Sequence, residues 1–72
     1  MKKVVNMDME YLKYKIRKKG MKMSDFSYQV GMTKSTLYTK LNGERQWKYY
    51  EMKKTKDTLD LSVDEFNKIF GF

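Results

Sequence analysis

The 72-residue sequence contains no cysteine, no histidine and no proline, and it has only four glycines. Without cysteine there are no disulfides, and without cysteine and histidine there is no thiolate or imidazole zinc site. Nucleophilic catalysis by cysteine or by a serine–histidine pair is excluded for the same reason. Proline and glycine are too scarce for a small all-β domain with many tight turns. A chain this short therefore requires a compact helical core.

Long apolar runs are also missing, since no stretch approaches the roughly 20 apolar residues of a membrane span. The basic start at Met1–Lys3 is not followed by the apolar segment of a signal peptide. No glycine-rich phosphate loop is present either. We expect a cytoplasmic protein that is not an enzyme and has no cofactor, no metal, no membrane association and no small-molecule substrate.

Positive charge is plentiful and unevenly distributed. There are 16 lysines and arginines against nine acidic residues, which gives a formal net charge of +7. Residues 58–72 depart from this balance, with one basic and three acidic residues. A strongly basic small domain favours a polyanionic partner such as nucleic acid, reached through residues 1–57. The alternative, in which the lysines only solvate helix surfaces, stays open.

The hydrophobic periodicity predicts an all-α fold of five short helices. Residues 1–7 are expected to form a flexible basic arm, with Lys2 and Lys3 either disordered or reaching DNA. Residues 8–72 are expected to form one domain, in which apolar residues recur at spacings of three and four. The expected helices cover about 8–19, 23–30, 34–42, 47 or 48 to 59, and a last segment that starts after Ser62.

Local signals predict where these helices begin and end. Asn6 or Asp8 can cap the first helix, and Gly20 supplies a left-handed stop. Thr33 is placed to cap the third helix. The clearest start is Ser62-Val63-Asp64-Glu65, which has the S-x-x-E spacing of a capping box.

The segment from Met23 to Gly43 has the pattern of a helix-turn-helix. Ser27 is small enough for two helices to cross closely, and Gly31 can adopt the positive φ of the turn. Met32 is expected to fill the space between the helices and the core. With Leu37 and Leu41 inward, the positions expected to face solvent or a ligand are Lys34, Ser35, Thr36, Tyr38, Thr39 and Lys40.

These residues carry a resemblance to a known family. The runs Val30-Gly31-Met32-Thr33-Lys34-Ser35-Thr36-Leu37 and Leu41-Asn42-Gly43-Glu44 resemble the helix-turn-helix of phage Cro/repressor-like (XRE-type) regulators. The likeness covers roughly residues 9–70 and is greatest to small regulators of phages and prophages of Gram-positive bacteria. It implies a lambda repressor-like domain of five helices that binds double-stranded operator DNA, often as a homodimer, in a bacterial cytoplasm near the nucleoid.

The resemblance also assigns roles to individual residues. It implies that Lys34, Ser35, Thr36 and Thr39 read bases in the major groove. It implies that the DNA backbone is contacted by Ser24, Tyr38, Lys40, Asn42, Arg45 and Lys48. Three positions depart from the family pattern: Met23 replaces a frequent glutamine, Lys22 replaces a serine or threonine cap, and Ser27 replaces a common alanine.

Several alternatives stay open from the sequence. The aromatic end formed by Phe66, Ile69, Phe70 and Phe72 suits either the core or a dimer patch. Trp47 and the pair Tyr49-Tyr50 suit either core packing or contacts with the DNA backbone. The rival function is a protein-interaction module that binds another regulator or a polymerase subunit, and a third is nonspecific coating of nucleic acid.

Overall fold

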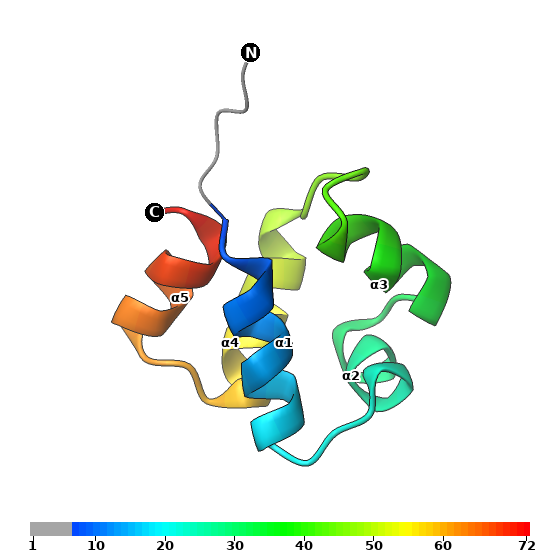
Figure 1. Cartoon of the computed structure of the whole chain (residues 1–72), viewed down its shortest axis with the longest axis horizontal. Helices are drawn as coiled ribbons and strands as arrows, with labels where there is room; N and C mark the ends of the chain where they lie inside the picture. The colour runs from blue at the N-terminus through cyan, green and yellow to red at the C-terminus, as the bar shows by residue number, and fades with distance from the viewer. Residues whose placement is uncertain (1–6) are drawn as a thin grey trace.

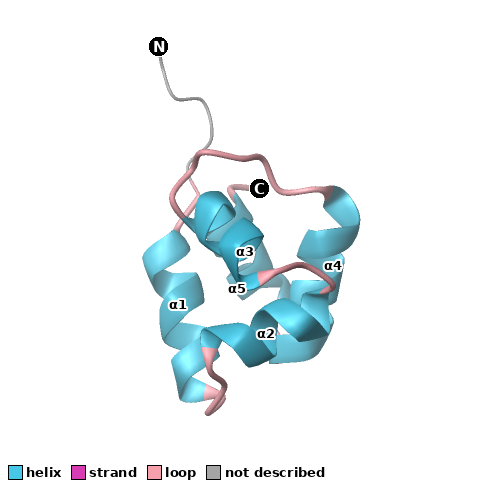
Figure 2. Ribbon diagram, turned by 90° about the vertical axis from the view of Figure 1, so that its right-hand side faces the viewer, coloured by secondary structure: helices cyan, strands magenta, loops and turns pink. Residues whose placement is uncertain are grey.

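A computed structural model describes residues 7–72, and all regular structure in that range is helical. The five helices are α1 (Met9–Lys18), α2 (Met23–Val30), α3 (Lys34–Leu41), α4 (Tyr49–Leu59) and α5 (Val63–Phe70). α1 packs against α5, while α2 contacts both α3 and α4. As a result, α3 and α5 lie on opposite sides of the domain (Figures 1 and 2). The predicted all-α class is confirmed.

Three of the helices, α1, α3 and α5, begin where a side-chain oxygen accepts from an amide of the first turn. Asp8 accepts from the Tyr11 amide at 3.0 Å, and Thr33 accepts from the Thr36 amide at 3.1 Å. At α5 the predicted capping box is confirmed, because Ser62 and Glu65 each accept from the other's backbone N–H. The fourth helix begins slightly later than expected, at Tyr49.

The core is formed by inward residues of all five helices and of the loops that precede α4 and α5. Half-buried methionines, including Met21, Met23 and Met32, fill the space around it. The buried hydrophobic residues are Leu12, Ile16, Phe26, Val30, Leu37, Leu41, Trp47, Met52, Leu59, Leu61, Ile69 and Phe70. This single cluster provides the hydrophobic stabilisation that a chain without disulfides or zinc sites needs.

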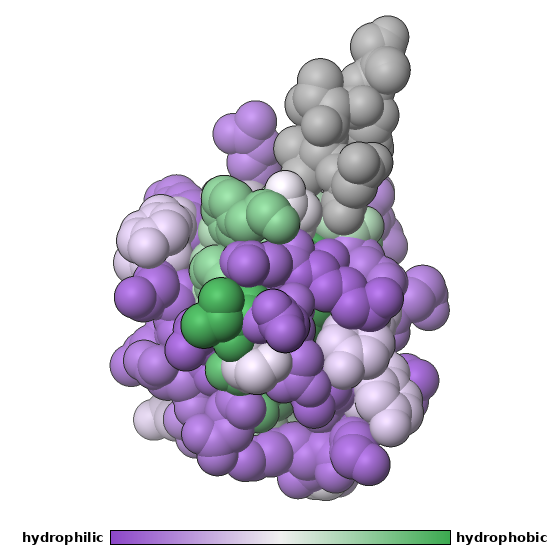
Figure 3. All heavy atoms as spheres, turned by 90° about the vertical axis from the view of Figure 1, so that its left-hand side faces the viewer, coloured by the Kyte–Doolittle hydropathy of each residue, from purple (hydrophilic) through white to green (hydrophobic). Residues whose placement is uncertain are grey.

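The aromatic C-terminal segment divides between core and surface. Ile69 and Phe70 are fully buried, so the interpretation that places these two in a dimer patch is wrong. Trp47 packs edge-on against Phe70 with ring centroids 5.2 Å apart, which makes it a core residue. Phe72 is exposed and stacks on the half-buried Phe66. Hydrophobic areas on this side are small and bordered by hydrophilic surface (Figure 3).

The basic arm predicted for residues 1–7 lies outside the described residues except for Met7. Met7 packs against the core, and the Asp8 amide donates to the Ile69 carbonyl at 2.9 Å. The globular domain therefore includes Met7, one residue earlier than expected. None of the five described helices has the length and apolar character needed to cross a membrane.

Candidate nucleic-acid interface

The turn between α2 and α3 is built as the sequence predicts. Gly31 has φ +87°, and its amide donates to the Ser27 and Tyr28 carbonyls, which closes α2. Ser27 is buried, and its hydroxyl donates to the Ser24 carbonyl at 2.8 Å. Met32 packs against the core. The turn thus fixes where Thr33 starts α3.

The first turn of α3 presents polar side chains that no neighbouring element covers. Lys34 and Ser35 are exposed, and their side chains make no hydrogen bond to another described residue. The Thr33 and Thr36 hydroxyls are hydrogen-bonded to each other at 3.0 Å, whereas the Ser35 hydroxyl has no partner among the described residues. This end of α3 can therefore donate hydrogen bonds, and it carries the ammonium of Lys34.

Farther along α3, Thr39 offers a different group. Its hydroxyl donates to the Thr36 carbonyl at 2.7 Å, which leaves the oxygen as an acceptor. Both threonines are half-buried, whereas Tyr38 is 42% exposed. The structure brings the four expected base-reading residues together on one short helix.

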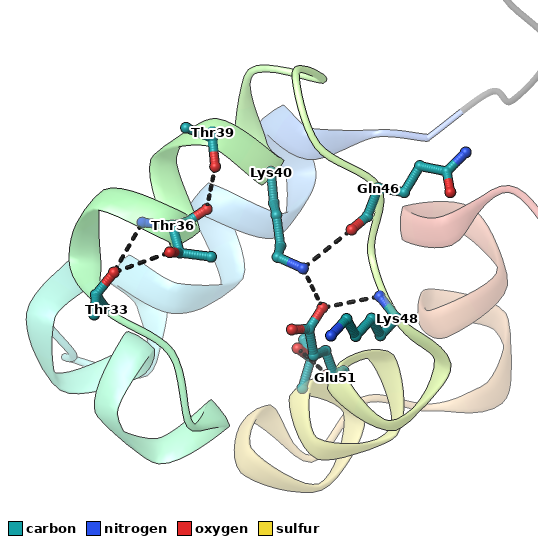
Figure 4. A network of polar contacts seen from close by, with 8 residues as sticks. Thr33, Thr36, Thr39, Lys40, Gln46, Lys48 and Glu51 are labelled. Carbon is teal, nitrogen blue, oxygen red and sulfur yellow. Dashed lines mark hydrogen bonds and ion pairs between the residues drawn. The ribbon is translucent and has the colours of Figure 1, made fainter.

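Lys40 does not face solvent, so its expected contact with the DNA backbone is wrong. It is 3% exposed, and its Nζ donates to Glu51 Oε1 at 2.6 Å and to the Gln46 carbonyl at 3.0 Å (Figure 4). Lys40 lies three residues after Leu37 and next to Leu41, on the inward side of α3. An ammonium buried in an ion pair cannot also reach a phosphate.

The loop between α3 and α4 carries the remaining expected backbone contacts. Asn42, Arg45 and Lys48 are all exposed. The amides of Glu44 and Arg45 both donate to the Thr39 carbonyl, at 2.9 and 3.3 Å, so the loop folds back onto the end of α3. Arg45 consequently lies close to the C-terminal end of α3, the end opposite Lys34.

Two helices start with lysine at the N-cap position. Neither Lys22 before α2 nor Lys48 before α4 makes a side-chain capping hydrogen bond, because an ammonium has no acceptor. Ser24, in the first turn of α2, is exposed. At both helix ends the backbone N–H of the lysine donates instead to a carboxylate three residues later, to Asp25 at 3.3 Å and to Glu51 at 2.8 Å, so each lysine side chain remains available to an anion.

Several cations on and near α2 and α3 form no ion pair with another described residue, although the exposed carboxylates Asp25 and Glu44 lie near them in the sequence. Among the described residues, Lys22, Lys34, Arg45 and Lys48 have no carboxylate within ion-pairing distance. By contrast, the acidic residues Asp64 and Glu65 belong to α5, which lies on the side away from α3 (Figure 1). A polyanion approaching α3 would meet these unpaired cations together with the exposed carboxylate of Glu44.

Sequence reasoning missed the Lys40–Glu51 pair and the exposure of the tyrosines that begin α4. Tyr49 is 66% and Tyr50 59% exposed, so the core interpretation fails for both. A signal for the ion pair was present: Lys40 shares the inward spacing of Leu37, and Glu51 lies beside the buried Met52. Two opposite charges at inward positions of neighbouring helices indicate a buried pair.

Comparison of the chain with protein-family models, with curated proteins and with solved structures found no match. The interpretation of this face therefore depends on its geometry and charge.

Proposed function

We propose that this protein is a sequence-specific double-stranded DNA-binding regulator that acts without catalysis, by occupying an operator. In this proposal α2 and α3 form a helix-turn-helix, and the first half of α3 enters the major groove. The observation that carries the proposal is the exposed start of α3, where the side chains of Lys34 and Ser35 have no partner among the described residues, together with the unpaired cations Arg45 and Lys48 in the loop after the other end of the helix.

The chemistry of α3 fits base edges. A lysine at position 34 can donate to the O6 and N7 acceptors of guanine, and the unpaired hydroxyl of Ser35 can donate to the same acceptors. Thr39 keeps an acceptor oxygen and a methyl group, which suit an amino group and a thymine methyl. Such a mixed set can discriminate between base pairs.

The surrounding residues fit the phosphate backbone. Arg45 and Lys48 from the loop, and Lys22 with Ser24 at the start of α2, can contact phosphates on either side of the groove. Regulation would be steric, since a protein bound over a promoter blocks polymerase. A homodimer would place two copies of α3 about 34 Å apart, in successive major grooves.

The test is a fluorescence anisotropy titration of labelled duplexes from the neighbourhood of the gene, at about 50 and about 200 mM salt. If Lys22, Arg45 and Lys48 each neutralise one phosphate, affinity falls about 40-fold between these two concentrations. Lys34→Ala with Thr39→Ala should remove the preference for one fragment. The control Lys18→Ala removes an exposed cation at the end of α1 and should keep that preference. Equal binding of all fragments by the wild type would overturn the proposal.

A protein-interaction module is the second candidate, and the exposed aromatic residues favour it. Tyr28 on α2 is 82% exposed, and Tyr49 and Tyr50 are also largely exposed. Tyrosine is enriched at protein interfaces. A partner bound through these residues would be released by Tyr28→Ala and would bind independently of Lys34, which separates this function from DNA binding.

A further inference from the structure

Lys40 and Glu51 form a buried ion pair at the junction of α3, the following loop and α4. Lys40 Nζ lies 2.6 Å from Glu51 Oε1, and the two side chains are 2% and 6% exposed. The pair also binds the loop backbone. Lys40 donates to the Gln46 carbonyl at 3.0 Å, and the Lys48 amide donates to Glu51 Oε1 at 2.8 Å (Figure 4).

These hydrogen bonds fix residues 46–48, the second half of the loop. Backbone hydrogen bonds fix the first half. The amides of Gly43, Glu44 and Arg45 donate to carbonyls of the last turn of α3. Arg45 therefore lies between one point held by the backbone of α3 and another held by the buried ion pair. Lys48 is held directly, through its own amide.

A buried ion pair is a poor source of net stability, because removing two charges from water offsets much of their attraction. Apolar side chains of similar volume would join α3 and α4 at least as well. Apolar side chains cannot, however, bind the Gln46 carbonyl or the Lys48 amide. The charged pair therefore adds directional hydrogen bonds to the loop backbone, and these bonds determine the conformation of the loop.

We propose that Lys40 and Glu51 are positioning residues that hold the loop 42–48 in the conformation presenting Arg45 and Lys48 to the DNA backbone. This role depends on the DNA-binding function proposed above. Neither side chain touches DNA. A loop already fixed in its bound conformation loses less conformational entropy on binding, which raises the affinity for phosphate.

The test uses the double variant Lys40→Met/Glu51→Gln, which leaves the net charge at +7 because one charge of each sign is removed. The glutamine side chain introduced by Glu51→Gln can still accept from the Lys48 amide, so the change centres on the link to Gln46. A second variant, Lys40→Gln/Glu51→Gln, also leaves the net charge unchanged and keeps a shorter hydrogen-bond donor at position 40. It replaces the first if methionine prevents folding, and circular dichroism monitors the fold of both.

Hydrogen exchange of the loop amides is the first readout, and binding of a labelled duplex of about 20 base pairs is the second. We expect loop exchange to accelerate about tenfold while the amides of α1 and α5 keep their protection. Affinity should fall about tenfold, and the salt slope should lose about one phosphate contact. At constant net charge, a merely structural pair would not change the salt slope of a folded variant.

Two results would overturn the proposal: wild-type loop exchange in the double variant, or faster exchange with unchanged affinity and salt slope. If the wild-type protein itself binds no duplex, the DNA-binding function fails separately. The exchange readout then decides alone whether the pair positions the loop.

Discussion

At the scale of single residues, Glu65 is the most heavily bonded carboxylate that the structure describes. It accepts from Lys15 Nζ and the Ser62 amide, both at 2.9 Å, and from the Tyr11 hydroxyl at 3.2 Å. The hydrogen bond from Lys15, followed by that from Ser62, lowers the pKa of Glu65 from 4.5 to about 2. One side chain thus joins α1 to the start of α5.

This shift predicts a loss of stability in acid. Because the folded-state pKa is below the unfolded one, the contribution of Glu65 is complete above about pH 4.5 and disappears as the pH falls through about 2. The melting temperature of the wild type should exceed that of Glu65→Gln near neutral pH, and the gap should narrow toward pH 2. A difference in melting temperature that stays constant across this pH range would contradict a lowered pKa of Glu65 as the source of this stability.

Thr33 gives a second prediction at this scale. Its hydroxyl is the N-cap acceptor of α3, so Thr33→Ala should lower the free energy of unfolding by about 1 kcal/mol. Ser35→Ala is the matched control, since Ser35 is exposed in the same helix turn and caps nothing. Urea unfolding measures both, and equal losses would show that the Thr33 cap is not the cause.

At the scale of elements, the helix starts and stops were largely predictable because their signals are local. The hydroxyls of Thr33 and Ser62 accept from amides three residues later, and Gly31 closes α2 through its own positive φ. None of these interactions depends on the rest of the fold. The spacing of apolar residues then indicated which side of each helix is buried.

The turn between α2 and α3 yields a prediction for an element. Gly31 has φ +87°, and a Cβ there would meet no atom within 4 Å, so strain alone determines the effect of a substitution. Gly31→Ala should destabilise the fold by about 1–2 kcal/mol. Gly31→Asn should cost less, because asparagine tolerates the left-handed region. Thermal unfolding tests this order, and equal losses would argue against backbone strain.

Burial that depends on distant partners was not predictable in the same way. Lys40 is buried by Glu51, eleven residues later, and both residue types usually face water. The exposure of Tyr49 and Tyr50 follows from the rotation of α4, which Glu51 and Met52 set by facing inward. The candidate interface was therefore predicted in outline, with Lys40 wrongly included.

At the scale of the whole molecule, α3 and α5 lie on opposite sides of one hydrophobic core. One side carries α5 with its capping box and acidic first turn, and the other carries α3 with unpaired cations beside it. Since the core joins both sides, substitutions of the exposed α3 residues Lys34 and Ser35 should leave the fold intact. The chain without cysteine, histidine or proline thus folds around a helical core. Its exposed cations Lys34 and Arg45 lie on and next to α3.

The most direct test of this account is a map of backbone amide chemical shifts of the ¹⁵N-labelled protein, recorded while an unlabelled duplex is added at low salt. We predict that the amides that shift or broaden lie in 33–39 and 43–51, and that those of α5 stay unchanged. Shifts confined to α5 and the C-terminal residues, or no shifts at any duplex concentration, would contradict the central claim that α3 and its loop form a DNA-binding face.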